Sequence, residues 1–291
     1  MMRVRVVPEA QLAGTVKEDW VDRGRRPYLS GGMAYVPVRD GYPCSLVIPP
    51  RRPYHGRAYS MIGPIAVFHG RRRPDADEIG ALLAWKKPSG VIWVRSCTGA
   101  GRIPDAEVLA GSAGEVVHRE CGITYRLDPA RIMFSAGNRR EKDRVAALVE
   151  PGEAVADMFA GIGYFTLPVA RSGGRVHAME INPDAFAYLR QNARDNHLED
   201  RIEPALGDCR NLLRGPYNRI LMGHFDSPAF LPAAIAHAAP GATIHVHSAG
   251  EAGARIRGCL GSLGIRAGLE IRKVKKLGPH TWHYVQDVTL P

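Results

Sequence analysis

Three acidic residues and a glycine turn are spaced as in proteins that hold an adenosine group. The turn begins at Asp157 and includes Gly161, and Glu180 and Asp208 follow one and two structural units later. A glycine after a strand lets the backbone approach a ligand closely. Glu180 can accept hydrogen bonds from both hydroxyls of a ribose. Asp208, with Cys209 supplying backbone, can bind an adenine amino group.

The third position of the turn separates two classes of adenosine-containing ligand. A dinucleotide-binding turn has the pattern Gly-x-Gly-x-x-Gly around a pyrophosphate, but here Gly161 and Gly163 are followed by Thr166. An aspartate before the turn, as at Asp157, is typical of S-adenosylmethionine sites, where it helps to place the amino-acid end of the cofactor. Each acid alone could be a solvated loop carboxylate, but the three in this order indicate S-adenosyl-L-methionine as co-substrate.

The elements that must position these residues alternate between strand and helix from Pro151 onward. This order predicts an α/β fold, a doubly wound Rossmann-like sheet of the class I S-adenosylmethionine-dependent type. A closing pair of strands predicts antiparallel pairing at the C-terminus. The expected strands are 154–159, 175–180, one before Gly207, 219–222, 243–247, 269–277 and 282–290, with a turn at Gly278-Pro279 and helices over 164–170 and from Asn182 to about 196.

The preceding part of the chain has short strands and turns, which predict a smaller α+β domain. We expect strands at 33–38 and 91–94, a helix at 75–85, a hairpin at 115–118 and 123–127, and a helix over 139–148 opened by Ser135 and Asn138. The domain boundary is expected near residue 130. This gives a basic domain at 1–130 and a transferase domain that binds S-adenosylmethionine at 131–291.

The positive charge is concentrated in the N-terminal half of the chain. The formal net charge is +10, and residues 1–144 hold 24 Lys and Arg against 15 Asp and Glu. Such a module beside a near-neutral one suggests a polyanion partner, although a basic surface without a partner remains open. Arginines near tyrosines can bind phosphate and stack on bases, so the first domain is predicted to bind a nucleic acid. The clusters are Arg23, Arg25, Arg26; Arg51, Arg52, Arg57; and Arg71, Arg72, Arg73.

The cysteines and the apolar runs indicate the compartment. The five cysteines are odd in number and form no Cys-x-x-Cys pair, so neither a disulfide framework nor a zinc site is expected, and no other metal. No apolar run approaches the roughly 20 residues that span a bilayer. The N-terminus has no apolar region of the secretory type. We therefore expect a cytoplasmic protein without membrane association, and no protein partner is indicated.

Several segments of the sequence resemble one family of tRNA-modifying enzymes. They are Phe134-Ser-Ala-Gly-Asn138, Arg140-Glu-Lys142-Asp-Arg144, the turn from Asp157 to Pro168, Arg219-Ile-Leu-Met-Gly-His224, and Trp282-His283. They resemble the wybutosine-synthesis aminocarboxypropyltransferases in their archaeal form, relatives of the tRNA guanine-37 N1-methyltransferases. The likeness covers about residues 90–291 and is weak before that.

The resemblance implies an activity and a set of site residues. The family transfers the 3-amino-3-carboxypropyl group of S-adenosylmethionine to C7 of 4-demethylwyosine at position 37 of tRNA(Phe), so the anticodon region of tRNA(Phe) would be the partner. Ser135 and Lys142 would hold the amino-acid end of the cofactor, although Lys142 could also be a solvated helix charge. Arg144 is a further candidate for the transferred carboxylate. No catalytic base is identified.

The end of the fourth strand separates this family from its methyltransferase relatives. The guanine-37 methyltransferases have Asn-Leu-Pro there, and the asparagine accepts a hydrogen bond from the base. This chain has Gly223-His-Phe-Asp226, and glycine has no side chain that could accept that bond. His224 or Asp226 could compensate or be structural. Two alternatives stay open, a tRNA guanine-37 N1-methyltransferase and a non-enzymatic RNA-binding protein with a decayed cofactor site.

Overall fold

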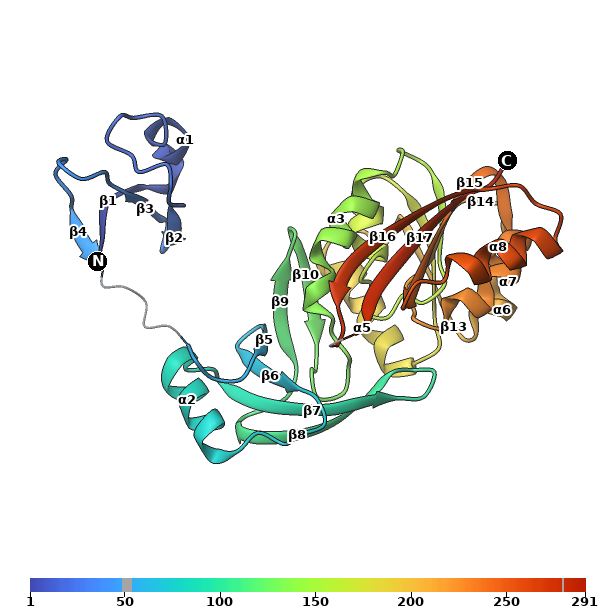
Figure 1. Ribbon diagram of the computed structural model, residues 1–291, viewed down its shortest axis with the longest axis horizontal. Coiled ribbons are helices and arrows are strands. Elements are labelled where there is room, and N and C mark those ends of the chain that lie inside the picture. Colours follow the sequence, from blue (N-terminus) through green and yellow to red (C-terminus); the bar gives the residue numbers. More distant parts are fainter. Residues whose placement is uncertain (49–53, 279) are drawn as a thin grey trace. The chain divides into compact units, whose positions relative to one another are not determined.

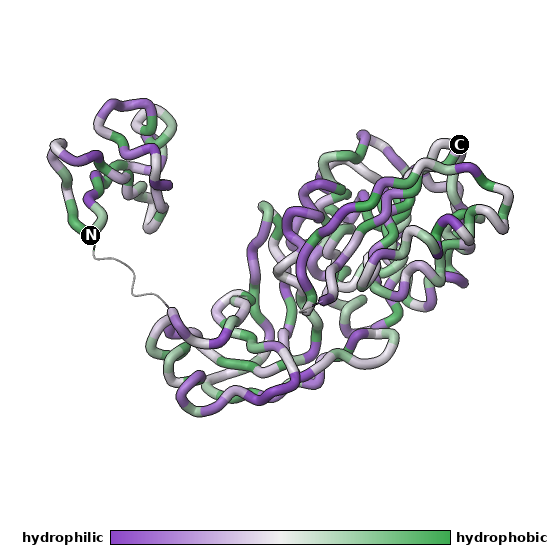
Figure 2. The backbone as a smooth tube through the Cα atoms, in the orientation of Figure 1, coloured by the Kyte–Doolittle hydropathy of each residue, from purple (hydrophilic) through white to green (hydrophobic). Residues whose placement is uncertain are grey.

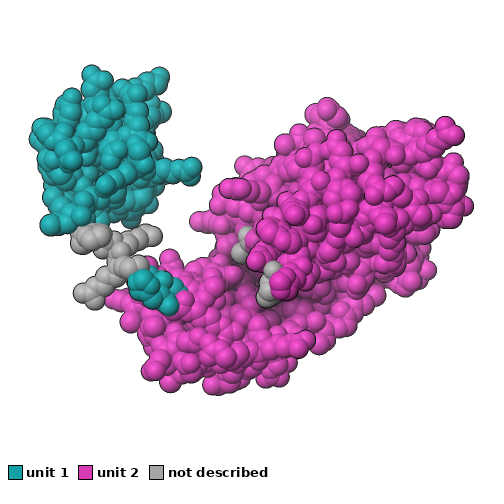
Figure 3. Space-filling view, in the orientation of Figure 1, with its two compact units in different colours: residues 1–55 teal, residues 56–291 magenta. Residues whose placement is uncertain are grey.

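The chain forms two compact units in a computed structural model that describes residues 1–48, 54–278 and 280–291. The units are Met1–His55 and Gly56–Pro291 (Figure 3). The chain therefore divides after residue 55, whereas the sequence suggested a boundary near residue 130. The predicted turn at Pro279 and the arginines Arg51 and Arg52 lie outside the described residues.

The Met1–His55 unit is a four-stranded antiparallel sheet with a small apolar core. Its strand order is β2-β3-β1-β4, and Val21, Ala34 and Val36 form the buried cluster. Tyr28 stacks on Tyr35 across neighbouring strands, with ring centroids 4.4 Å apart. The elements are β1 (Met2–Pro8), η1 (Glu9–Gln11), α1 (Leu12–Thr15), β2 (Tyr28–Ser30), β3 (Met33–Pro37) and β4 (Leu46–Ile48).

The Gly56–Pro291 unit begins with a second four-stranded sheet in the order β5-β6-β7-β8. Strands β6 and β7 are parallel, and the predicted helix, α2, connects them. A capping box between Asp75 and Glu78 fixes the start of that helix. The elements are β5 (Tyr59–Ile62), β6 (Ile65–His69), α2 (Ala76–Lys86), β7 (Gly90–Thr98) and β8 (Ile103–Gly111).

The predicted hairpin joins this sheet to the rest of the unit. It consists of β9 (Val116–Glu120) and β10 (Ile123–Leu127). The Asn192 amide accepts a hydrogen bond from the backbone N–H of Arg126 at 2.7 Å and donates to the carbonyls of Arg126 and Ile162. One apolar cluster also contains both Ile92 and Leu189. Because these contacts cross residue 130, the chain does not divide there.

The largest sheet has the predicted class I topology, with seven strands in the order β13-β12-β11-β14-β15-β17-β16. The first five are parallel, and β17 pairs antiparallel with both β15 and β16 (Figure 1). Hydrophobic segments follow its central strands (Figure 2). The strands are β11 (Ala154–Asp157), β12 (Arg175–Glu180), β13 (Ile202–Leu206), β14 (Tyr217–Met222), β15 (Ala238–Ala249), β16 (Gly268–Lys276) and β17 (Trp282–Thr289).

The helices of this sheet differ from the predicted ones mainly at their starts. Neither Ser135 nor Asn138 caps α3 with its side chain, because a 3₁₀ turn, η2 (Ala136–Asn138), precedes that helix. The Asn182 side chain does cap α5, as predicted. Among the described residues, no helix is long and apolar enough to span a membrane. The helices are α3 (Arg139–Ala147), α4 (Thr166–Arg171), α5 (Pro183–Asp195), α6 (Cys209–Leu212), η3 (Ser227–Phe230), α7 (Leu231–Ala236) and α8 (Gly253–Ser262).

Candidate functional site

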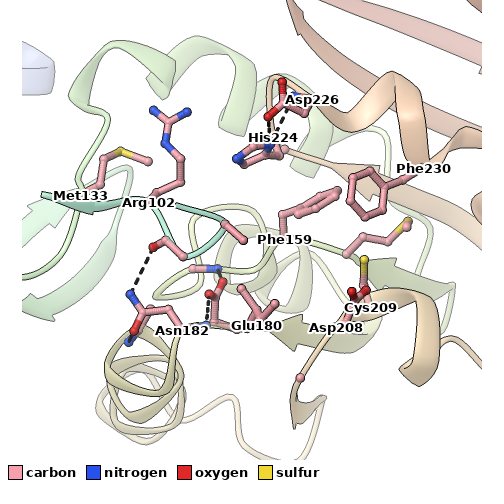
Figure 4. A pocket seen from close by; sticks show the side chains of 18 of the residues that line it. Arg102, Met133, Phe159, Glu180, Asn182, Asp208, Cys209, His224, Asp226 and Phe230 are labelled. Carbon is pink, nitrogen blue, oxygen red and sulfur yellow. Dashed lines mark hydrogen bonds and ion pairs between the residues drawn. The ribbon is translucent and has the colours of Figure 1, made fainter. Parts of the chain in front are cut away.

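A cavity of about 310 Å³ lies at the carboxyl ends of the parallel strands, and Glu180 at the end of β12 is its best-fixed acid. One carboxylate oxygen accepts a hydrogen bond from the backbone N–H of Gly161, and the other accepts one from Asn182, both at 2.7 Å (Figure 4). Burial raises the pKa of Glu180, and these N–H groups oppose that rise. Gly161 has φ +57, so the turn that supplies its N–H favours glycine.

Asp157 supports the turn from behind and does not line the cavity. Its side chain is fully buried at the end of β11, where it accepts hydrogen bonds from the Thr166 hydroxyl at 2.7 Å and from the backbone N–H of Phe159 at 3.3 Å. Burial raises the pKa of Asp157 to about 6. Thr166 therefore bonds to Asp157 at the position where a dinucleotide turn has its third glycine. The sequence pattern gave no indication of this contact.

Asp208 and Cys209 line the same cavity at the start of α6. The Asp208 carboxylate accepts a hydrogen bond from the backbone N–H of Arg210 and pairs with its guanidinium, which lowers the pKa of Asp208. Cys209 is buried, and burial raises the pKa of its thiol to about 12. The rings of Phe159 and Phe230 meet edge to face at 5.1 Å in the same cavity. We call this cavity the acidic compartment.

A second cavity of about 520 Å³ adjoins the first. Both are bordered by Arg102, Ile132, Met133, Gly223 and His224. Its other titratable lining residues are His69, Cys97, Lys275 and Lys276, and no Asp or Glu is among the described residues that line it. We call it the cationic compartment. Ser135 lines it, with its hydroxyl accepting a hydrogen bond from the Lys275 ammonium at 2.7 Å.

The end of β14 forms part of the boundary between the compartments. Gly223 borders both, and a Cβ there would lie 3.3 Å from the ring of Phe165. The His224 ring lies 5.4 Å from that of Phe159, and burial together with Arg102 lowers the pKa of His224. Asp226 lies 3.7 Å from the His224 ring and is exposed.

Neither Lys142 nor Arg144 lines either compartment. The Lys142 ammonium is buried 2.6 Å from a carboxylate oxygen of Glu120, among three aromatic rings. Those rings belong to Tyr125, Phe134 and Tyr164, with centroids 5.1 to 5.8 Å from the ammonium. Arg144 pairs with Glu141 at 2.7 Å and with Asp287 at 2.8 Å. The charges of both side chains are therefore balanced by neighbouring carboxylates.

The structure thus brings some of the predicted residues together and adds others. Gly161, Glu180, Asp208 and Cys209 line the acidic compartment, and Ser135 lines the cationic one.

Arg102 follows a glycine-containing turn between β7 and β8, and the Asn182 amide donates to the carbonyl of Gly101 in that turn. Figure 4 shows the Arg102 guanidinium pointing away from Glu180. The sequence interpretation missed Arg102 and Lys275, and nothing in their local pattern marks them. No group of three potential metal ligands occurs in the described parts of the chain.

Comparisons with known proteins place this architecture among tRNA-modifying enzymes. The family described as "TRM5/TYW2 methyltransferase domain" matches residues 116–260. The tRNA(Phe) (4-demethylwyosine(37)-C(7)) aminocarboxypropyltransferase of Methanocaldococcus jannaschii is 33% identical over 245 residues, which are 80% of this chain and 97% of that protein. The crystal structure of Pyrococcus horikoshii TYW2 in complex with MeSAdo is 31% identical, with a TM-score of 0.69, covering 81% of this chain and 92% of that one.

A methyltransferase relative matches a longer part of the chain. The crystal structure of Trm5b from Pyrococcus abyssi is 26% identical, with a TM-score of 0.74, and covers 100% of this chain and 99% of that one. The length that the Pyrococcus horikoshii structure leaves uncovered is about that of the Met1–His55 unit. The whole length of the chain therefore has a structural counterpart in Trm5b, and the chain also has a sequence likeness to the aminocarboxypropyltransferases.

Proposed function

Because this chain belongs to the family of tRNA(Phe) 4-demethylwyosine C7 aminocarboxypropyltransferases, we propose that it transfers the 3-amino-3-carboxypropyl group of S-adenosyl-L-methionine to C7 of 4-demethylwyosine at position 37 of tRNA(Phe). The observation that carries this proposal is the end of β14. There Gly223 borders both compartments and offers no side-chain acceptor to a guanine nitrogen. The acidic compartment fits the nucleoside, because Glu180 can accept from ribose hydroxyls and Asp208 from an adenine amino group.

The proposed reaction is a displacement at a sulfonium, in which geometry selects the carbon that reacts. Electrons of C7 form a bond to the γ-carbon of the methionine chain while the bond from that carbon to sulfur breaks, with its electron pair remaining on sulfur. C7 then loses its proton, and methylthioadenosine leaves. Since the leaving group is a neutral thioether, the protein's task is mainly to orient the two reactants. Glu180, fixed by the N–H groups of Gly161 and Asn182, holds the donor's nucleoside end in our proposal.

The proposed partner is the anticodon region of tRNA(Phe), and the arginine-rich N-terminal part of the chain is proposed to contact the tRNA. Arg3 and Arg5 lie on β1, and the Arg5 guanidinium lies 4.3 Å from the centroid of the Trp20 ring. Such pairs can bind phosphate and stack on bases. The five free cysteines are consistent with a reducing compartment, and we propose the cytoplasm. If the protein binds the phosphates of tRNA, its affinity for tRNA should fall steeply between 50 and 200 mM salt. An affinity that does not change with salt would contradict the proposed tRNA contact of the N-terminal part.

The product of the donor tests the proposed reaction directly. The protein is incubated with S-adenosylmethionine labelled in the carboxypropyl chain and with tRNA(Phe) that carries 4-demethylwyosine. We expect methylthioadenosine in solution and the label on the tRNA. The whole-chain match to Trm5b favours one alternative, methyl transfer to guanine 37. Release of S-adenosylhomocysteine from tRNA with an unmodified guanine 37 would establish that alternative. Absence of S-adenosylmethionine binding by calorimetry would favour a non-enzymatic RNA-binding protein.

A further inference from the structure

A β-bulge directs one lysine of the C-terminal strand pair into the molecule. Lys273 of β16 is paired with Tyr284 of β17, but Lys275 is paired with His283, so β16 has one extra residue between the two pairs. Tyr284 and His283 are neighbours and point to opposite faces of the sheet, and paired residues share a face. Lys273 and Lys275 therefore point to opposite faces although they lie two positions apart. Bulges are common beside active sites, where they redirect a side chain.

The two lysines have very different surroundings as a result. Lys273 is exposed, and its ammonium lies 5.4 Å from the ring centroid of Trp282. Lys275 is half-buried, lines the cationic compartment and donates to the Ser135 hydroxyl at 2.7 Å. A Cβ on Gly137 would lie 2.8 Å from Cδ and 3.0 Å from Nζ of Lys275. The absence of a side chain at Gly137 therefore makes room for Lys275.

The charge of Lys275 is not balanced by a carboxylate of the described part of the chain. Its recorded hydrogen-bond partner, Ser135, is neutral, and no described Asp or Glu lines the same cavity. Lys142, the other lysine of this region, already has Glu120 as its ion-pair partner. Burial and the charge of Lys142 lower the pKa of Lys275. The negative charge of an anion in the cationic compartment would stabilise this ammonium, so the compartment is suited to a small carboxylate.

We propose that Lys275 binds the α-carboxylate of the methionine chain of S-adenosylmethionine, with Ser135 fixing the position of its ammonium. The inference rests on the proposed function and assigns the group that orients its donor. The nucleoside is held in the acidic compartment and the carboxylate in the cationic one, so the chain between them must cross the boundary at Gly223. That path presents the γ-carbon to the cationic compartment, where the acceptor base can approach it.

The test compares three ligands on full-length protein by calorimetry, because they share the nucleoside and differ in the methionine chain. S-adenosylmethionine has the α-carboxylate, decarboxylated S-adenosylmethionine lacks only that carboxylate, and methylthioadenosine lacks the whole chain. In the wild type, we expect removal of the carboxylate to weaken binding about 10- to 100-fold, the usual effect of a charge-assisted hydrogen bond. In Lys275→Met the two sulfonium ligands should bind about equally, while the affinity for methylthioadenosine stays within about twofold of wild type.

Three further variants separate this role from others. Lys273→Met, on the opposite face of the same strand, should keep the wild-type discrimination, and Lys275→Arg should restore part of it. The proposal is overturned if Lys275→Met still discriminates between the two sulfonium ligands, or if Arg102→Met removes the discrimination instead. These measurements do not depend on the acceptor. If carboxylate discrimination depends on Lys275 but the product is S-adenosylhomocysteine, the proposed function fails and the assignment of Lys275 stands.

Discussion

The two adjoining compartments differ in the sign of their charges, and the difference distinguishes two parts of one substrate. The acidic compartment contains Glu180 and Asp208, whose carboxylates suit the hydroxyl and amino donors of a nucleoside. The cationic compartment contains Lys275 and shares Arg102, and it has no carboxylate among its described lining residues. The first arrangement suits any user of S-adenosylmethionine. The second, in our proposal, holds the methionine chain and so orients the carbon that is transferred.

The largest expected effect concerns the lysine that lies outside the cationic compartment. Lys142→Met leaves the buried Glu120 with only His118, at 3.7 Å, as a partner, so the free energy of unfolding should fall by about 3 kcal/mol. Urea unfolding measures this loss. Affinity for S-adenosylmethionine should stay within about twofold wherever the variant is folded. This result would sharpen the comparison by assigning Lys142 to stability and Lys275 to the substrate.

A double variant is the control for the loss of Lys142. Combining Lys142→Met with Glu120→Gln removes both charges and should recover most of the lost stability, because no buried charge is left without a partner. The opposite outcome is a folded, stable Lys142→Met protein with more than tenfold weaker S-adenosylmethionine binding. That outcome would return Lys142 to the cofactor role suggested by the sequence.

The next effect tests the acidic compartment. Glu180→Gln removes the carboxylate that accepts hydrogen bonds from the backbone N–H groups of Gly161 and Asn182 and, in our proposal, from the ribose hydroxyls. Binding of the donor should therefore weaken about 100-fold. Calorimetry should show the same loss for S-adenosylmethionine and methylthioadenosine, since both contain the ribose. Glu203→Gln is the matched control, because Glu203 lies on the neighbouring strand β13 and is largely exposed. A loss of affinity for S-adenosylmethionine alone would contradict the assignment of the nucleoside to the acidic compartment.

The acidic compartment was largely predictable from sequence, and the cationic one was not. Gly161, Glu180 and Asp208 each follow a strand of a parallel sheet, and the carboxyl ends of such strands meet at one edge. Local pattern therefore places them together. Lys275 enters its compartment through a bulge and through the missing side chain of Gly137, which is 138 positions away in the sequence. Neither feature leaves a periodic signal.

Long-range packing also explains the other differences from the sequence interpretation. The Lys142 charge resembled a solvated helix charge or a ligand, but Glu120 pairs with it from the hairpin strand β9. The expected boundary near residue 130 followed a change in pattern from short strands to alternating strands and helices. The contacts of Asn192 with Arg126 cross that point, and they join residues 66 positions apart. Local sequence patterns carry no information on such contacts.

The boundary between the compartments gives a smaller effect. Gly223→Asn introduces the hydrogen-bonding side chain that the sequence resemblance implies for the methyltransferases, but its Cβ would meet the Phe165 ring at 3.3 Å and its amide would occupy the boundary. We expect kcat/KM for aminocarboxypropyl transfer to fall about 30-fold, or about 2 kcal/mol. Methylthioadenosine should remain the product, because Lys275 still directs the chain. Gly223→Ala, which adds only the Cβ, isolates the contact with Phe165. If Gly223→Asn released S-adenosylhomocysteine, residue 223 and not the cationic compartment would select the carbon.

The smallest effect is a pH dependence of stability beside the cationic compartment. His283, paired with Lys275 across the strands, is buried with Nε2 2.8 Å from Nδ1 of His247. Burial and the charge of Lys275 lower the pKa of His283 from 6.5 to about 4.

Between those pH values the unfolded chain binds a proton at His283 that the folded protein does not bind. The contribution of His283 to stability is therefore present above pH 6.5 and is lost as the pH falls toward 4. Lowering the pH from 7.5 to 5.5 should remove about 1 kcal/mol through His283. Urea unfolding at the two pH values measures this loss in the free energy of unfolding, and the loss should be smaller by that amount in His283→Gln than in the wild type. An equal loss in both proteins would show that the pKa of His283 is not lowered in the folded protein.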